Sequence, residues 1–465
     1  MRRGYLHTVV WVTLATVLAL LALYWLPAWQ LGDHAMRRVD ILADLRGDST
    51  AVDDDVVGDS LALGQVDSCR SDITCIEDYS NGGPSGMASF YAALAALDTL
   101  QRPVRIAVLG DSYIEGDLLT ADLRALLQSR YGGCGVNFMP ICTATMGFRT
   151  SVVQRADGWE MHFANDEEGY EKACANFTGG YFYGHEGAWV SARGVRLKPH
   201  LDTCQVSTLY YMGSGHALVS ATINGSRRQA MGIGNEPGIA SVSVEGNIHR
   251  ITWSIDTLAG PLAFLGLSMD GRRGIVVDNL GLRAASGHHL SEVSPEMLVA
   301  MDRVRHYDLV ILMYGLNIMA SGKTDYSTHA TRMGEALDHL KAAMPATSFL
   351  VVSVGDRGGK VGDEVHTRRE VPFMVATQRK IAQNAGVAFW NMYRAMGGRD
   401  AAVRWATEPR PSVNQDFTHV NGRGGRRIAT MLDKALRWGF SQHGGPEIEP
   451  IYSTTITPKK GGAQP

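Results

Sequence analysis

Two short motifs, far apart in a chain of 465 residues, contain a serine, a histidine and an aspartate that together could catalyse acyl transfer. Gly110-Asp111-Ser112 follows an apolar run, and Asp416-Phe417-Thr418-His419 lies near the end of the chain. A serine hydroxyl attacks a carbonyl carbon when an imidazole takes its proton and a carboxylate orients that imidazole. The sequence therefore offers Ser112 as the nucleophile, His419 as the general base and Asp416 as the acid that orients the base.

Each motif also has an ordinary structural explanation. A serine at the end of a strand can act as the N-cap of the next helix, so Gly110-Asp111-Ser112 alone does not establish a nucleophile. An Asp-x-x-His sequence occurs readily by chance, and His419 by itself would also suit a core histidine. The context favours the chemical interpretation, because the serine follows a predicted strand and the histidine precedes the last predicted helix.

Alternating strand and helix patterns position both motifs. Val104 to Leu109 predicts a buried strand, and leucines at helical spacing beyond Ser112 predict a helix, with the serine at the turn between them. Such alternation predicts a parallel sheet covered by helices, with active residues at the carboxyl ends of the strands. Further strands are expected at Asp308 to Met313, Phe349 to Val354 and Val387 to Trp390, and helices at Ser327 to Met344, Val371 to Ala385 and about Gly424 to Trp438.

The segment from about Met146 to Arg273 breaks this alternation. It is rich in Gly, Tyr and Thr, shows no lasting helical period and contains runs typical of strands. Asn224-Gly225 has the composition of a hairpin turn. We therefore expect an all-β sandwich inserted into the α/β domain, whose aromatic residues either contact sugars or fill its core.

Two further strand ends carry groups that could stabilise an oxyanion. Asn317 follows the strand ending at Met313, and its side-chain amide could donate a hydrogen bond to the charged oxygen. Gly281 follows the short strand Gly274 to Val277, and its backbone N–H could donate together with that of Ser112. The ordinary alternatives are a cap or turn role for Asn317 and a tight turn that requires glycine at Gly281.

The chain resembles the SGNH (GDSL-like) hydrolase family, in which serine, glycine, asparagine and histidine come from four separated motifs. Here the four residues are, in chain order, Ser112, Gly281, Asn317 and His419. The match covers the α/β part, from about Ala88 to Gln442 without the insertion. The resemblance implies the triad roles already assigned and an oxyanion hole formed by Ser112, Gly281 and Asn317. One departure is Ile318, since family members usually carry Asp or Glu after the asparagine.

A narrower resemblance rests on four motifs: Gly110 to Asp117, Tyr131 to Gly135, Phe389 to Asn391 and Ala395 to Gly398. In these motifs the chain is similar to a bacterial envelope subgroup, the peptidoglycan O-acetylesterases, which carry a carbohydrate-binding-module-like β domain at the place of the insertion. It implies a serine esterase that removes acetyl groups from the C6 hydroxyl of N-acetylmuramic acid through an acetyl-serine intermediate. Tyr113, beside the nucleophile, is our candidate for substrate contact.

The composition and the N-terminus bear on location and partners. The net charge of -3, without a basic stripe, argues against nucleic acid as a partner. Arg2 and Arg3 precede an almost uncharged stretch from Tyr5 to Trp29, which is long enough to cross a membrane as a helix. No small-x-small cleavage site follows it, so we expect an uncleaved inner-membrane anchor with the catalytic part in the periplasm or extracytoplasmic space. Cleavage would make the protein secreted.

Six cysteines fit an oxidising compartment. Neighbours in the sequence suggest the pairs Cys69–Cys75, Cys134–Cys142 and Cys174–Cys204, although other pairings are open. No CxxC or HxH spacing indicates a metal site, and the expected chemistry requires no cofactor.

The sequence thus predicts an α/β fold: an SGNH-type parallel sheet flanked by helices, with an inserted all-β (jelly-roll-like) domain and an N-terminal transmembrane helix. Two other functions stay open: a glycan O-acetyltransferase with the same triad, and a non-catalytic wall-glycan-binding protein. The predicted division is a cytoplasmic stub and signal-anchor helix at 1–29, a spacer at 30–75, the first part of the hydrolase domain at 76–145, the inserted β-sandwich at 146–273, the second part of the hydrolase domain at 274–443, and a disordered tail at 444–465.

Overall fold

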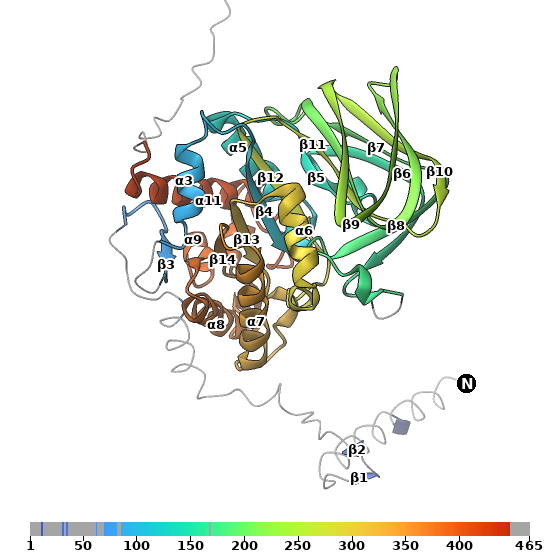
Figure 1. Cartoon of the computed structure of the whole chain (residues 1–465). Coiled ribbons are helices and arrows are strands. Elements are labelled where there is room, and N and C mark those ends of the chain that lie inside the picture. The colour runs from blue at the N-terminus through green and yellow to red at the C-terminus, as the bar shows by residue number, and fades with distance from the viewer. Residues whose placement is uncertain are drawn as a thin grey trace, which may run out of the picture. The chain divides into compact units, whose positions relative to one another are not determined.

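The computed structural model of the chain describes residues 11–12, 30–31, 34–35, 62, 69–80, 85–166 and 169–446 (Figure 1). The chain divides into two compact units, Met1–Val57 and Gly58–Pro465. In the first unit, β1 (Gln30–Leu31) pairs with β2 (His34–Ala35) in antiparallel orientation. The elements described below all belong to the second unit.

A six-stranded sheet lies at the centre of the second unit. In order across the sheet, its strands are β12 (Ile275–Gly281), β4 (Val104–Gly110), β13 (Leu309–Met313), β14 (Ser348–Val352), β17 (Ala388–Trp390) and β3 (Ile76–Asp78). The first five strands run parallel, whereas β3 runs antiparallel to β17. The central strands are almost wholly buried, which explains why their sequences are nearly continuous apolar runs.

Helices cover both faces of this sheet (Figure 1). Alternate side chains of β4 face opposite sides: Ile106 and Val108 belong to one apolar cluster, and Ala107 and Leu109 belong to another. The first cluster is completed by α3 (Ala88–Ala95), α5 (Thr120–Tyr131), α9 (Met392–Met396), α10 (Ala401–Thr407) and α11 (Gly422–Gln442), and the second by α6 (Pro295–Arg305), α7 (Ser327–Ala343) and α8 (Glu370–Ala385).

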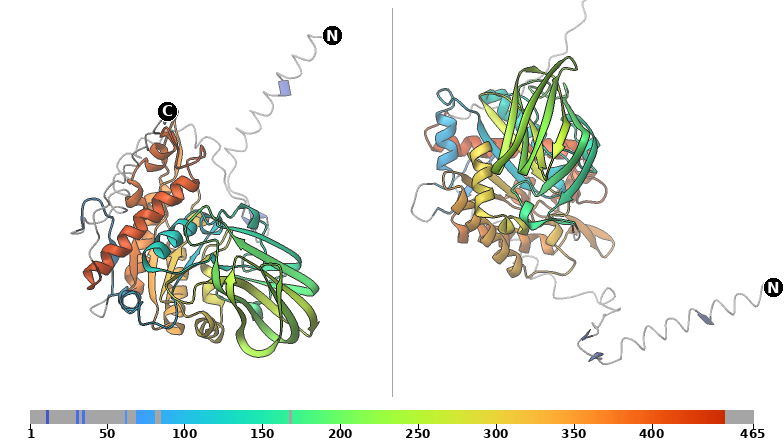
Figure 2. Two further views of the ribbon diagram at one scale, coloured as in Figure 1. Left: turned by 90° about the horizontal axis from the view of Figure 1, so that it is seen from above. Right: turned by 45° about the vertical axis from the view of Figure 1, so that its right-hand side comes forward.

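Between α5 and β12 the chain forms a seven-stranded antiparallel sheet. Its strands are β5 (Asn137–Met139), β6 (Val152–Phe163), β7 (Gly180–Gly194), β8 (Cys204–Ile223), β9 (Arg227–Ile248), β10 (Arg250–Ala259) and β11 (Ala263–Asp270). The long strands curve strongly along their length (Figure 2). They pack around an apolar core that contains Trp253 and Phe264. Asn224 and Gly225, with φ of 54° and 79°, form the tight turn between β8 and β9 that their composition predicts. The strands share one continuous hydrogen-bonded sheet, in place of the two separate sheets that a sandwich would have.

The predicted fold class is wrong in two respects. The central sheet is mixed and not parallel, because the three-residue edge strand β3 adds to β17 in antiparallel orientation. Among the described residues, no helix is long and apolar enough to cross a membrane, so the predicted transmembrane helix and membrane partner are not found. Apart from Trp11 and Val12, the stretch from Tyr5 to Trp29 lies outside the described residues. The domain boundaries stay a prediction.

One of the three predicted disulfides is present. Cys69 and Cys75 are bonded to each other, as expected from their spacing. The other two predicted pairs are wrong, because their four cysteines are free thiols. For example, β5 lies between Cys134 and Cys142 in the sequence, and its extended backbone separates these two cysteines.

A buried charge cluster joins the two sheets. Arg305, at the end of α6, donates hydrogen bonds to Asp278 of β12 through Nε at 2.7 Å and through Nη2 at 2.5 Å. It also forms an ion pair with Asp270 of β11. Tyr307 donates to Asp278 at 2.9 Å from a fully buried position. Because each charge is paired and hydrogen-bonded, this cluster fixes the seven-stranded sheet against the strand that leads to the candidate site.

Candidate active site

Ser112 lies at the carboxyl end of β4, where it begins the short helix α4 (Ser112–Glu115). Asp111 is the N-cap of this helix, since its carboxylate accepts a hydrogen bond from Tyr113 N–H at 2.9 Å. The capping role considered for Ser112 therefore belongs to Asp111. Ser112 is partly exposed, and within the described part of the chain its N–H donates no hydrogen bond, which leaves it available to a ligand.

Asp416 and His419 form a hydrogen-bonded pair in the loop before α11. Asp416 Oδ2 lies 2.7 Å from His419 Nδ1, and Asp416 Oδ1 accepts the backbone N–H groups of Thr418 and His419, each at 3.0 Å. Phe417, with φ of 53°, occupies a backbone conformation that is rare for a bulky residue and lets the loop turn this sharply. The arrangement leaves Nε2 of the imidazole as the atom able to exchange a proton with a nucleophile.

The electrostatics of this pair suit an orienting carboxylate. Partial burial raises the pKa of Asp416, but the hydrogen bonds from His419 and Thr418 outweigh it and hold the pKa below its ordinary value. Asp416 therefore carries a negative charge at neutral pH, as a carboxylate that orients a general base requires. The side chains of Asp416 and His419 are 49% and 60% exposed, so a large substrate has access to them.

Packing of α11 brings this loop to the nucleophile. Gly425, in the first turn of α11, lies so close to Leu118 that an added Cβ would come within 2.1 Å of Leu118 O. His419 is near enough to Asp111, the neighbour of Ser112, to lower its pKa electrostatically. Within the described residues, Ser112 Oγ makes no hydrogen bond to His419. Such catalytic contacts often become short only when substrate binds.

Gly281 ends β12 directly beside the serine turn. In the parallel register Gly110 pairs with both Gly281 and Met313, so the carboxyl ends of β12, β4 and β13 are level with one another. A Cβ on Gly281 would lie 2.1 Å from Glu115 N, so only glycine permits this close approach of β12 to α4. Gly281 N–H already donates to Asn279 Oδ1 at 3.1 Å, and an oxyanion would have to share or replace that bond.

Asn279 is a site residue that the sequence patterns do not reveal. Its side-chain amide Nδ2 donates to Ile114 O at 2.6 Å and to Thr120 Oγ1 at 2.8 Å, while its Oδ1 accepts from Gly281. Asn279 is buried, so these bonds have no competition from water. It thereby holds the Gly281 turn against the helix that carries Ser112.

Asn317 lies after β13, in the single helical turn Leu316–Ile318, with an exposed side chain. Its amide Nδ2 donates to Ala285 O at 3.0 Å, in the loop that follows Gly281, and retains a second N–H for a ligand. In the same loop, Ala284 has φ of 59°, and its N–H donates no hydrogen bond to the described residues. This loop and Asn317 therefore present donors on the side of the sheet edge where Ser112 lies.

Tyr113 does not occupy the position proposed for it. Its side chain is 6% exposed and packs in the apolar cluster behind α4, with its hydroxyl buried and unpaired among the described residues. The structure thus assigns Tyr113 to the core. Among the described residues, no group of three or more His, Cys, Asp or Glu side chains is arranged to hold a metal ion.

The sheet, the serine turn and the aspartate–histidine loop together give the chain an SGNH-type fold with an inserted β-sheet. A solved structure of a peptidoglycan O-acetylesterase shares this fold with a TM-score of 0.65 and 19% sequence identity, over 79% of this chain and 99% of that chain. The resemblance recognised in the motifs is thereby confirmed for the fold.

Other similar structures are more distant. A family two carbohydrate esterase from Cellvibrio japonicus matches 63% of this chain and 98% of its own at 10% identity, and an acetyl xylan esterase matches 35% and 80% at 15% identity, each with a TM-score of 0.25. No protein-family model and no curated protein matches the chain significantly.

Proposed function

We propose that this chain is a serine esterase that removes O-acetyl groups from cell-envelope glycan, specifically from muramic acid of peptidoglycan. The observation that carries the proposal is the Asp416–His419 pair, hydrogen-bonded at 2.7 Å on a loop that packs beside the Ser112 turn. The choice of substrate rests on the fold shared with a peptidoglycan O-acetylesterase.

In the proposed reaction, Ser112 Oγ attacks the acetyl carbonyl carbon while His419 Nε2 takes the hydroxyl proton. The negative charge on the carbonyl oxygen is stabilised by Ser112 N–H, Gly281 N–H and the free N–H of Asn317. When the tetrahedral intermediate collapses, the bond to the sugar oxygen breaks and His419 protonates that oxygen. Water, activated by His419, then attacks the acetyl-serine, which releases acetate and restores the Ser112 hydroxyl.

The exposure of the site supports hydrolysis over transfer to a second glycan. The side chains of Asp416 and His419 are about half exposed, so water reaches the position of the acetyl-serine. A transferase must shield this intermediate from water to favour another acceptor. An exposed site also suits an ester on a bulky polymer, which could not enter a closed pocket.

Acetate release from purified O-acetylated peptidoglycan tests the proposal, with chemically de-O-acetylated peptidoglycan and the Ser112→Ala variant as controls. We expect acetate only from the acetylated polymer and the active protein. Equal release by Ser112→Ala would exclude the serine mechanism. Acetyl transfer to added glycan in excess of acetate release would favour the transferase.

A further inference from the structure

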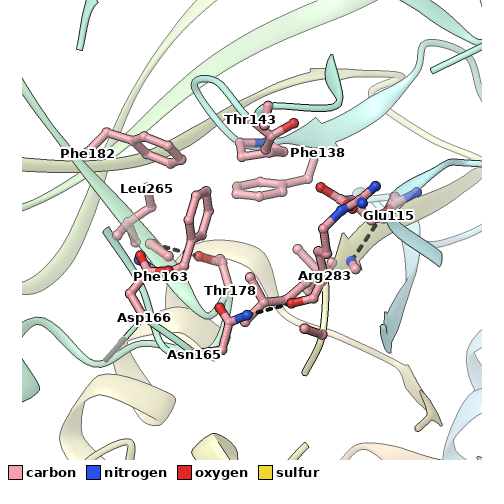
Figure 3. Close-up of a pocket in the computed structure, with 18 residues that line it drawn as sticks. Glu115, Phe138, Thr143, Phe163, Asn165, Asp166, Thr178, Phe182, Leu265 and Arg283 are labelled. Carbon is pink, nitrogen blue, oxygen red and sulfur yellow. Dashed lines mark hydrogen bonds and ion pairs between the residues drawn. The ribbon is translucent and has the colours of Figure 1, made fainter. Parts of the chain in front are cut away.

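A cavity of about 260 Å³ lies between the seven-stranded sheet and the candidate active site (Figure 3). One wall is formed by the end of β12 and the loop after it, including Gly281 and Arg283. The opposite wall comes from the seven-stranded sheet, and Glu115 of α4 completes the side nearest the nucleophile. Glu115 is one helical turn from Ser112, so the cavity begins about 5 Å along the helix from the reacting serine.

The walls of the cavity combine aromatic surface with a few polar groups. Figure 3 shows the rings of Phe138, Phe163 and Phe182 turned toward the same space. Phe163 and Phe182 contact each other edge to face, with centroids 5.8 Å apart, which fixes both rings. At the edge of the cavity Arg283 Nε pairs with Glu115 at 3.2 Å, and its side chain is 63% exposed.

A second polar contact closes the cavity on the other side. Asn165, in the loop after β6, donates from its side-chain amide to Arg283 O at 2.6 Å. This bond joins the seven-stranded sheet to the loop that follows Gly281, one of the proposed oxyanion donors. A group bound in the cavity would therefore contact both parts of the molecule at once.

We propose that this cavity binds the sugar unit next to the one that carries the ester, an inference that rests on the proposed function. The volume is slightly below the range of about 300–1,000 Å³ typical of small-molecule pockets, so it accommodates one sugar-sized group and not a longer chain. The phenylalanine rings contact the apolar face of the sugar or the methyl of an N-acetyl group, and Arg283 and Asn165 lie where they can bind its oxygens.

The chemistry of the cavity favours a sugar over a lipid or a long acyl group. An alkyl chain would have to remain beside the Glu115–Arg283 ion pair without hydrogen bonds to it. The acyl group of the ester is bonded to Ser112 during the reaction, and Ser112 does not line the cavity. The cavity therefore suits the alcohol part of the ester, which is the glycan.

The test uses Ala144→Trp, which places a large side chain at an exposed position lining the cavity. Ala95→Trp, at an exposed position on α3, is the matched control. We expect Ala144→Trp to raise KM for O-acetylated peptidoglycan fragments about tenfold and to leave kcat/KM for 4-nitrophenyl acetate within about twofold. Phe163→Ala is expected to act in the same direction, and Ala95→Trp to change neither substrate.

Binding of tetra-N-acetylchitotetraose, measured by calorimetry in a Ser112→Ala background, separates this inference from the proposed function. Loss of binding on adding Ala144→Trp supports the subsite, even if the wild-type chain releases no acetate from glycan. Unchanged binding and unchanged glycan kinetics in Ala144→Trp overturn it. An equal loss of activity on 4-nitrophenyl acetate also overturns it, because the cavity would then affect the chemistry and not the glycan.

Discussion

Asp111 is a buried carboxylate directly beside the proposed nucleophile. It precedes the proposed nucleophile, caps α4 and is 2% exposed. Burial raises the pKa of its carboxyl to about 6, although the Tyr113 N–H and the charge of His419 act to lower it. Ionisation of Asp111 at neutral pH therefore lowers the free energy of unfolding of the protein.

Replacing Asp111 by Asn should remove this cost. The folded state binds the Asp111 proton more tightly than the unfolded state, so stability falls as pH rises from about 4 toward 6. Asn retains an oxygen that can accept from Tyr113 N–H. Relative to wild type, we expect Asp111→Asn to gain up to about 3 kcal/mol of unfolding free energy between pH 4 and pH 7, measured by urea denaturation. A difference that does not change with pH would contradict the raised pKa.

Asn317 is a proposed hydrogen-bond donor to the oxyanion, and a substitution tests this role. Asn317→Ala should lower kcat by about 10²–10³ because one donor to the transition state is lost. The side chain is exposed and its one observed bond goes to Ala285 O, so unfolding free energy should change by only about 1 kcal/mol. Measurement of kcat on 4-nitrophenyl acetate beside a thermal melt checks both parts. Full activity in Asn317→Ala would remove this residue from the mechanism.

At the scale of elements, the close contact between β12 and α4 determines where Ser112 lies. The two elements meet at Gly281, which leaves no room for a Cβ beside Glu115 N. Asn279 then bonds the strand end to α4. Displacement of this turn should therefore move the nucleophile away from His419.

Gly281→Ala tests this positioning. We expect a loss of about 1–3 kcal/mol of stability from overpacking, together with most of the activity. Gly334→Ala is the control, since it lies in α7 where an added Cβ has no neighbour within 4 Å. The comparison is made by melting temperature and by kcat on 4-nitrophenyl acetate. A fully active Gly281→Ala protein would show that the contact is not needed.

The elements that the sequence predicts well are those with strong local patterns. Val104 to Leu109 and Asp308 to Met313 recur as β4 and β13 within one residue, because buried parallel strands need continuous apolar runs. The hydrogen bonds of Asn279 to both Gly281 and α4 could not be predicted, because they depend on how segments distant in the sequence approach each other. Tyr113 differs from the prediction because adjacent residues of a helix point in different directions, so a neighbour of the nucleophile need not face the substrate.

At the scale of the whole molecule, the Arg305 cluster connects the inserted sheet with the catalytic sheet. Arg305 is 1% exposed, and its two carboxylate partners belong to different sheets. Neither the insertion pattern nor the strand patterns predict such a contact, since Asp270, Asp278 and Arg305 carry no local signal of pairing. The extracytoplasmic location inferred from the N-terminus stays a prediction.

Arg305→Met should be strongly destabilising. It leaves two buried carboxylates without their cation, which costs about 3–5 kcal/mol. Adding Asp270→Asn to Arg305→Met should recover part of the loss, because one of the unpaired charges is removed. Urea denaturation of the single and double variants measures both effects. If Arg305→Met unfolds like wild type, the cluster does not hold the two sheets together.

The central claim is that Ser112 carries the acetyl group between glycan and water. The most direct measurement is peptide mass spectrometry of the protein after acid quench during turnover of O-acetylated peptidoglycan. We expect one acetyl group on the peptide containing Ser112, its transfer to water as acetate, and its absence in Ser112→Ala. Acetate release at the wild-type rate by Ser112→Ala, or acetylation confined to another residue, would contradict it.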